Sequence, residues 1–483
     1  MSMILPNVNL ISLLPELLLL AGATVLLFIR GAGRGRGIFP VAVASVVASL
    51  AALAFFWDQG VRGFDGLITR DNGALLFQMM ILIAALISFV LADDYLPEHR
   101  NAGEYFSLLL FALIGTGIMT STGDLLVIFL GIEILSLSLY VLVGFLKDVR
   151  AGMEGAIKYF LLGSFSSALF LLGLALWYGA TGATKLAAFA VPAAAPALLQ
   201  AGAALMIAGL GFKIAAAPFH MWAPDVYEGA PVCVASFISV APKIAAFAVF
   251  LRFASEIAGP GREAFAAAVI FMSVAGMVIG NFTALRQTGI VRMLAYSGIA
   301  QAGYILIGLL AVPEGGASAI AFYLIVYIFM NLGAFASVSH LSRRQGRTLQ
   351  IDDLAGLAAR HPRHAFALAV FMVSLAGIPP TGGFFAKFYI FKVGIDAGYL
   401  SVVLIAIITT IVSFCYYLRV VMVMYMEEAG EEAWEGTLPR PAGATLIGVM
   451  IAAIVVLTFL LGILPEEFLR SAATALPAVI AGI

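Results

Sequence analysis

The sequence predicts an all-α polytopic membrane protein with fourteen transmembrane helices. Of its 483 residues, 63% are hydrophobic and only 11% are charged, and the mean hydropathy is +1.07. A soluble domain carries about a quarter charged residues. Fourteen stretches approach the roughly 20 apolar residues that a spanning helix needs. The loops between them alternate between many and few basic residues, as expected for loops on the two sides of a membrane.

These stretches define the predicted helices in chain order, with boundaries uncertain by a few residues. The tenth is diluted by Tyr296, Ser297 and Gln301. The twelfth is too long for a plain span and contains a Gly- and Pro-rich interruption, residues 377–383. The predicted helices are 10–29, 38–57, 73–92, 105–121, 124–146, 156–178, 198–217, 232–254, 265–282, 294–312, 317–338, 365–394, 400–425 and 443–464.

The distribution of lysine and arginine predicts the orientation of the chain. Loops after odd-numbered helices hold Arg30, Arg34, Arg36, Arg100, Lys147, Arg150, Arg286, Arg292, Arg343, Arg344, Arg347, Arg360, Arg363, Arg419 and Arg440. Loops after even-numbered helices, and the tail, hold only Arg62, Arg70, Lys185, Arg252, Arg262 and Arg470. Basic loops stay on the cytoplasmic side, so we expect both termini outside.

The composition argues against several classes of protein and site. A net charge of −1 offers no basic field for nucleic acid. Cys233 and Cys415 both lie in apolar stretches and fit no disulfide framework, iron–sulfur cluster or zinc site. No histidine pair has metal-ligand spacing, so we expect no metal or cofactor in this chain. The first twenty residues lack a basic region and a cleavage site, and we expect them in the mature protein.

The chain is predicted to form a single membrane domain, residues 1–483, without long linkers. Helix 7 is interrupted at Pro218 and helix 12 at the Gly- and Pro-rich segment 377–383. Helices 4–8 (about 105–254) and 9–13 (about 265–425) then form two five-helix units with a broken helix at the same place in each. An odd number of helices per unit makes the repeat inverted, and matching broken helices indicate a transport site.

Ionisable residues inside the predicted helices are the candidate site. A charge near the bilayer centre costs about 2.5–3.5 kcal/mol on insertion scales, and such residues generally serve transport or proton relay. Glu133 in helix 5, Lys213 beside the first break, Lys243 in the middle of helix 8 and Lys387 after the second break therefore predict a proton path. A protonated, structurally bonded Glu133 is the alternative for that residue.

Two further candidates have stronger structural alternatives. Lys158 lies near the start of helix 6, where its long side chain could instead reach the membrane surface. His220 follows the first break and could shuttle protons at neutral pH, or be a hydrogen-bonded structural residue. His340, His361 and His364 fall in cytoplasmic loops and are expected to be solvated.

These residues resemble those of the antiporter-like membrane subunits of respiratory complex I, and among them the subunit N group. The resemblance rests on Glu133, on the segment from Gly377 to Lys387, and on the block 212–231 that contains Phe212-Lys213, Pro218-Phe219-His220, Trp222 and Asp225-Val-Tyr-Glu-Gly-Ala-Pro. Sibling subunits would carry glutamate at the position of Lys387, or a long lateral helix after helix 14. One departure is Ala217, where siblings often have proline.

The resemblance implies a proton-translocating, membrane-arm subunit of bacterial NADH–quinone oxidoreductase in the inner membrane. The resemblance also implies that Glu133 pairs with Lys213, that Lys243 is the central proton relay and that Lys387 leads to the outer exit. FMN and iron–sulfur clusters would reside in partner subunits, and this chain would have none. The partners would be other complex I membrane subunits, the lipid bilayer and protons, with no nucleic acid.

Two other functions remain open at this stage. Subunits of multisubunit cation/proton antiporters and of membrane-bound hydrogenases share the broken helices and buried lysines. A structural membrane subunit with vestigial charges is the third possibility, and the presence of Glu133, Lys213, Lys243 and Lys387 together argues against it.

Overall fold

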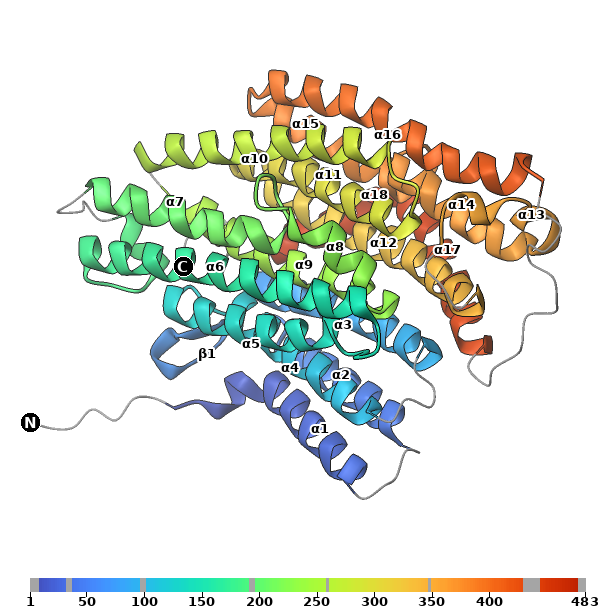
Figure 1. Ribbon diagram of the computed structural model, residues 1–483. Coiled ribbons are helices and arrows are strands. Elements are labelled where there is room, and N and C mark those ends of the chain that lie inside the picture. The colour runs from blue at the N-terminus through green and yellow to red at the C-terminus, as the bar shows by residue number, and fades with distance from the viewer. Residues whose placement is uncertain are drawn as a thin grey trace, which may run out of the picture.

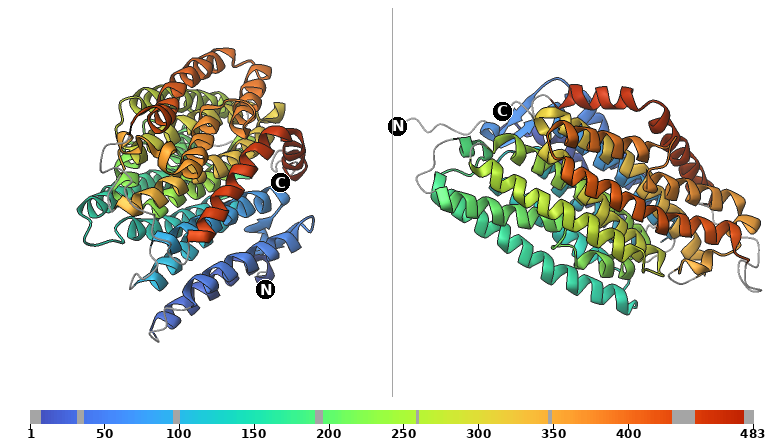
Figure 2. Two further views of the ribbon diagram at one scale, coloured as in Figure 1. Left: turned by 90° about the vertical axis from the view of Figure 1, so that its right-hand side faces the viewer. Right: turned by 90° about the horizontal axis from the view of Figure 1, so that it is seen from above.

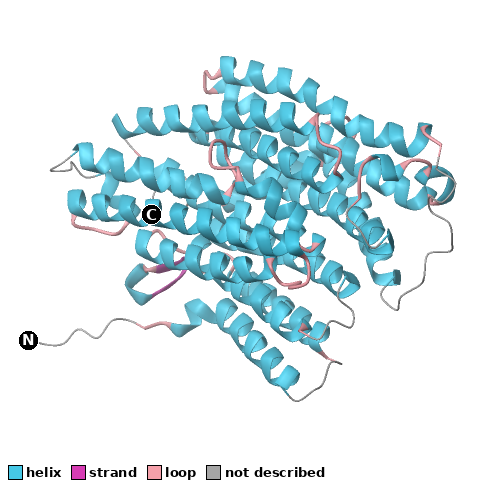
Figure 3. Cartoon of the chain, viewed as in Figure 1, coloured by secondary structure: helices cyan, strands magenta, loops and turns pink. Residues whose placement is uncertain are grey.

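The described part of the chain is almost entirely helical. The computed structural model describes residues 8–31, 37–95, 101–190, 196–257, 260–345, 349–428 and 444–476. Within these ranges, strands occur only in a short antiparallel hairpin formed by β1 (Val61–Gly63) and β2 (Ile68–Arg70) (Figure 3). The predicted all-α class is therefore confirmed.

Thirteen helices of the described chain are long and apolar enough to cross a membrane. They include α1 (Leu14–Gly31), α2 (Ile38–Phe56), α3 (Asn72–Tyr95), α4 (Ala102–Thr120), α5 (Leu125–Val143), α6 (Arg150–Thr181), α7 (Pro196–Lys213), α9 (Val232–Glu256), α10 (Pro260–Ala284), α11 (Ile290–Leu310), α12 (Ala317–Gln345), α16 (Leu400–Met426) and α17 (Ala444–Ile463). The predicted twelfth segment appears as two shorter helices, α14 (Pro362–Ala376) and α15 (Gly382–Asp396). Fourteen crossings remain a prediction. In it, α14 and α15 together form the predicted twelfth crossing, which is not among the thirteen long helices.

The long helices share a common direction and form a thick bundle, with α1 on one flank and α15 and α16 on the other (Figures 1 and 2). Helix α9 lies at the centre, where α3 and α12 pack against it. The spanning part of α9 is buried along its whole length, and α11 nearly so. A helix that is apolar on all sides belongs in a core or a membrane, which fits this arrangement.

Contacts between loops show that successive helices run in alternating directions. The Thr69 amide donates to the Ser121 carbonyl at 2.7 Å, which brings the loops after α2 and α4 together. A backbone bridge between Asp124 and Lys185 adds the loop after α6 to the same end of the bundle. Another bridge, between Gly289 and Gln350, joins the loops after α10 and α12. Which end faces the cytoplasm remains a prediction.

Both predicted helix breaks are present. Helix α14 ends at Ala376, and α15 begins at Gly382. Helix α7 ends at Lys213, five residues before Pro218, and the short helix α8 (Trp222–Gly229) follows after a turn. The first break therefore begins earlier than the sequence suggested. A positive φ of 56° at Ala215 already ends the helix, before the proline is reached.

Helix pairs in the first five-helix unit have counterparts in the second. Helix α4 packs on α5 and on α9, and α5 packs on α6. At the corresponding places α10 packs on α11 and on α16, and α11 packs on α12. This agreement fits the inverted repeat, which stays a prediction until the units are superposed. The small helix α13 (Leu357–Arg360) lies in the connection between α12 and α14, and α18 (Pro465–Ala475) follows α17, after the second unit.

Candidate functional site

Three lysines on three helices form the buried part of the candidate site. Lys213 ends α7, Lys243 lies near the middle of α9 and Lys387 lies in the first half of α15. They are 3%, 2% and 4% exposed. A buried ammonium must find hydrogen-bond acceptors inside the protein, because leaving it without partners is very costly. The acceptors of the three lysines differ, and they define the site.

Lys213 donates a hydrogen bond to a side chain of α5. Its Nζ lies 2.6 Å from Ser136 Oγ. Glu133 lies one turn earlier on the same helix, within electrostatic reach of Lys213, and its buried Oε1 has no hydrogen-bond partner among the described residues. The ammonium thus has a hydroxyl partner, with a carboxylate nearby on the same helix. The direct Glu133–Lys213 pair stays a prediction.

At the end of α7 the Phe212 carbonyl accepts from the Ala215 amide of the turn at 3.1 Å and also from a side chain. The indole Nε1 of Trp222 donates to the Phe212 carbonyl at 3.1 Å. Tyr159 stacks on the same indole ring, with 4.5 Å between ring centroids. Trp222 therefore stabilises the break without using Lys213, whose ammonium is left to bind α5.

Lys243 is held by the backbone of α11. Its Nζ donates to the Gly298 carbonyl at 2.6 Å and, more weakly, to the Tyr327 hydroxyl at 3.4 Å. Its position in the middle of the fully buried α9 keeps the ammonium away from both ends of the bundle. Snorkelling to the membrane surface is therefore not available to this residue.

Lys387 occupies the carbonyl end of α14. Its Nζ donates to the Leu375 and Ala376 carbonyls at 3.1 and 2.8 Å. Both carbonyls belong to the last turn of α14. No following helical turn supplies amide groups that could donate to them. The ammonium also lies 5.1 Å from the centre of the Tyr304 ring, within the range of a cation–π contact. The second helix break therefore provides the carbonyl acceptors of this lysine.

A chain of polar side chains joins the surroundings of Lys243 to those of Lys387. Ser297, next to Gly298 on α11, shares a hydrogen bond with the Tyr417 hydroxyl. Gln301 donates to that hydroxyl at 3.2 Å and to the Leu375 carbonyl at 3.2 Å. The Leu375 carbonyl is also an acceptor for Lys387. Within the described chain, Lys213 lies outside this network.

Sequence reasoning missed most of the residues of this network. Ser297 and Gln301 appeared only as polar residues that weakened the tenth predicted helix. In the structure both are buried and point to α14 and α16 rather than to lipid. Their low hydropathy in an otherwise apolar stretch was the available signal. Ser136 and Tyr417 carried a similar signal, a hydroxyl within an apolar helix.

Lys158 lies in a surface ion cluster, apart from the three buried lysines. It is the ninth residue of α6, which begins earlier than predicted, and its side chain is 42% exposed. Its Nζ lies 2.7 Å from Asp225 of α8, whose other oxygen accepts from Arg292 of α11 at 2.8 Å. Arg292 also binds Glu228 at 2.9 Å. The cluster ties α6, α8 and α11 together beside the first break.

The histidines occupy two different environments. His220 is half-buried after the first break, and its Nδ1 has no hydrogen-bond partner in the described part of the chain. The expectation that His340 is solvated is wrong: it is 5% exposed, its Nδ1 lies 3.4 Å from Asp94 Oδ2, and its ring stacks on His364. It lies inside α12, where packing with α3 and α14 buries it.

The arrangement can hold and exchange protons. Each buried lysine donates to an acceptor in hydrogen-bond range, and hydroxyl and amide groups connect two of the three. Burial disfavours the charged form of a lysine and a nearby carboxylate favours it. A change in that balance would make such a group release or take up a proton. Within the described residues, no group of three or more His, Cys, Asp or Glu side chains could hold a metal ion.

Comparisons with known proteins identify relatives that match most of the chain. The family described as NADH:quinone oxidoreductase/Mrp antiporter, transmembrane, matches residues 122–413. NADH-quinone oxidoreductase subunit N of Trichlorobacter lovleyi is 39% identical, covering 97% of both chains. A chain of respiratory complex I from Thermus thermophilus, solved with bound aureothin, is 32% identical with a TM-score of 0.81 and covers 94% of this chain and 98% of its own length.

One likeness extends to the fold alone. A chain of the Mrp complex from Dietzia has a TM-score of 0.84 and covers 98% of both chains, but it is 23% identical. It shows that the same helical fold occurs in a chain of a different complex. The full-length match to subunit N, together with the family match, places the sequence more narrowly: the chain is a multi-pass membrane protein that belongs to the NADH-quinone oxidoreductase subunit N family.

Proposed function

We propose that this chain is a membrane-arm subunit of NADH-quinone oxidoreductase that translocates protons, driven by electron transfer from NADH to quinone in partner subunits. The observation that carries the proposal is the set of three buried lysines, each bound to an internal acceptor. Glu133, Lys213, Lys243 and Lys387 form the path. Near the first break, Lys158 is the ion-pair partner of Asp225, and His220 acts as a proton shuttle.

The proposal includes a setting for the subunit. FMN and iron–sulfur clusters belong to partner subunits, and this chain contributes the proton path alone. The complex lies in the bacterial inner membrane, with both termini of this chain on the periplasmic side. The excess of basic residues after odd-numbered helices supports that orientation.

Proton movement through the site follows from the contacts of each lysine. Lys213 exchanges its proton when its ammonium moves between Ser136 and the nearby Glu133. Lys243 takes up and releases a proton near the centre, and the α11 side chains Ser297 and Gln301 lead toward Lys387. Each charge moved across the membrane costs about 2.3 kcal/mol per 100 mV, so the drive comes from the redox subunits.

The test replaces Lys243 by arginine and by alanine in the assembled complex. Arginine keeps the positive charge but stays protonated at any working pH. If proton release at this residue matters, Lys243→Arg lowers NADH-driven proton uptake into vesicles nearly as much as Lys243→Ala. Assembly of both variants is checked by the yield of purified complex. Full activity of Lys243→Arg would remove Lys243 from the path and leave it a fixed-charge role.

A further inference from the structure

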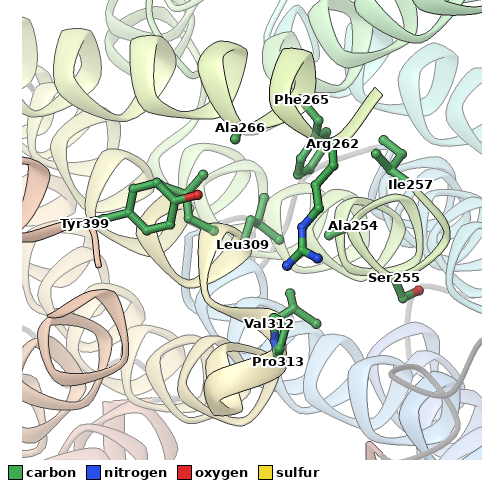
Figure 4. Close-up of a pocket in the computed structure, with 11 residues that line it drawn as sticks. Ala254, Ser255, Ile257, Arg262, Phe265, Ala266, Leu309, Val312, Pro313 and Tyr399 are labelled. Atoms are coloured by element: carbon green, nitrogen blue, oxygen red, sulfur yellow. The ribbon is translucent and has the colours of Figure 1, made fainter. Parts of the chain in front are cut away.

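A pocket lies at one end of the bundle, away from the buried lysines. It has a volume of about 260 Å3 and lies where α9 ends, α10 begins and α11 meets α12. Arg262 points into it from the start of α10, and Tyr399, between α15 and α16, turns its hydroxyl inward from the other side (Figure 4). Leu309, Val312 and Phe265 contribute apolar walls. The pocket therefore combines a cation and a hydroxyl with hydrocarbon surface.

The charge inside the pocket is positive. Arg262 has no ion-pair partner among the described residues, in contrast to Arg70 and Arg252, whose guanidinium groups bind carboxylates. Three acidic residues adjoin lining residues in the sequence: Glu256 precedes Ile257, Glu263 follows Arg262 and Glu314 follows Pro313. None of the three is among the described residues that line the pocket. An unpaired guanidinium in such a recess suits a phosphate group, which it can bind bidentately.

A small apolar groove, with a volume of about 30 Å3, adjoins this pocket between α7 and α10. Ile257 and Phe265 line both the pocket and the groove. The remaining groove residues are Gln200, Ala203, Ala204 and Ile207 of α7 and Ala264 and Ala268 of α10. Alanine side chains on both helices leave a shallow channel between them. From Gln200 to Ile207 it follows α7 for about 10 Å, at 1.5 Å per residue.

The position of the pocket identifies the kind of ligand. Helix ends of a spanning bundle lie at the membrane–water interface, where headgroups are found, and the groove runs from there into the hydrocarbon region. A polar, cation-lined recess that opens into an apolar channel matches a molecule with an anionic head and an acyl chain. Neither a soluble anion nor a plain hydrocarbon would use both parts.

We propose that this pocket and groove bind an anionic phospholipid, with its phosphate on Arg262 and one acyl chain between α7 and α10. Helix α7 belongs to the first five-helix unit and α10 to the second. The lipid therefore fills the seam between the two units on the membrane face. This site is separate from the proposed proton path and does not depend on it.

The test uses the purified whole complex and a phosphatidylglycerol probe with a photoreactive group in its acyl chain. We expect crosslinks on the α7 and α10 segments 200–207 and 264–268 after illumination. A phosphatidylcholine probe with the same chain reports the contribution of the anionic charge. Arg262→Gln should lower phosphatidylglycerol labelling about fivefold, the factor that corresponds to about 1 kcal/mol for one basic residue at an anionic lipid.

Matched variants separate this site from nonspecific effects. Arg62→Gln removes another exposed arginine and should leave labelling unchanged. Ala204→Phe should block the groove, whereas Ala201→Phe, an exposed alanine of α7 that does not line it, should not. Added inorganic phosphate should not compete, because it lacks the chain. Equal labelling by both lipid probes would overturn the proposal, and so would unchanged labelling in both Arg262→Gln and Ala204→Phe. The comparison of the two probes uses the unmodified complex and so does not depend on the assembly of any variant.

Discussion

Different side chains bind the backbone carbonyls at the ends of the two broken helices. At the first break the indole of Trp222 donates to the Phe212 carbonyl, and Lys213 is left to bind Ser136 on another helix. At the second break Lys387 itself donates to the Leu375 and Ala376 carbonyls. The first lysine therefore has a side-chain partner, and the second has a backbone partner.

This difference predicts different roles for the two lysines. A side-chain hydroxyl or carboxylate can rotate and a carboxylate can change its charge, so Lys213 can be switched by Glu133. Carbonyls of a helix end keep their position and their partial negative charge, so the surroundings of Lys387 are constant. We expect the first break to regulate proton transfer and the second to provide a fixed exit from the network.

The turns that end α7 and α14 share one geometry. The Ala216 amide donates to the Gly211 carbonyl at 2.8 Å, and the Ile378 amide donates to the Val373 carbonyl at 3.2 Å. Both are the six-residue closure of a Schellman motif, which places a left-handed residue after the helix. That residue is Ala215, at φ 56°, in the first break and a glycine in the second.

The largest effect is expected from crowding the second break. A Cβ on Gly383 would lie 1.8 Å from the Ser374 carbonyl oxygen, so Gly383→Ala must push α14 and α15 apart. We expect little assembled complex and little NADH-driven proton uptake. The matched change near the first break, Gly211→Ala, meets the Met272 and Phe219 side chains at 3.1 and 3.2 Å and should be tolerated. Equal yields of complex from both variants would contradict the steric argument.

The next effect concerns the switch at the first break. Glu133→Ala should leave the complex assembled, because Lys213 keeps its bond to Ser136, but lower proton uptake about tenfold, or about 1.4 kcal/mol in the barrier. Ser136→Ala should cost less, since Glu133 can still accept from the lysine. The double variant should show a non-additive loss, because both side chains serve one ammonium. Wild-type uptake in assembled Glu133→Ala would refute this role.

A smaller effect is expected from exchanging the left-handed residues. Gly377→Ala should lower the stability of the assembled complex by about 1 kcal/mol, because a Cβ is disfavoured in that conformation. Its Cβ would also lie 3.0 Å from Lys387 Cδ and disturb the lysine. Ala215→Gly should be close to neutral, as the relief of strain offsets the added flexibility. Thermal inactivation of the two variants checks this, and the opposite ranking would show that the turns are not equivalent.

The smallest effect concerns Asp225 and pH. Burial raises the pKa of this carboxyl group, but hydrogen bonds from Lys158 and Arg292 outweigh it and hold the pKa below the ordinary 3.8. A depressed pKa stabilises the fold above the unfolded-state value, and that stability is lost only as pH falls through the folded-state value. Asp225→Asn should therefore lower thermal stability by the same small amount at pH 6, 7 and 8. A difference that shrinks across this range would show that Asp225 titrates there.

The sequence was sufficient for the class of protein, the approximate positions of the thirteen long apolar helices of the described chain and the two broken helices. Burying apolar surface in lipid requires long apolar runs, and interrupting a helix requires proline or glycine, so both leave local signals. The three buried lysines were predicted for the same reason, because a charge in an apolar run is visible without any knowledge of its neighbours.

The partners of those lysines depended on the tertiary structure. Ser136 lies 77 residues from Lys213 in the chain, and Gly298 lies 55 residues from Lys243. Hydropathy averages a whole segment and does not report which face of a helix turns inward, so Ser297 and Gln301 looked like weaknesses in a span. Helix packing turned them toward the core, buried His340, and left Lys158 at the surface. The sequence alone determined that charges would be buried, because their cost is local, whereas their partners required the packing of helices that are distant in the chain.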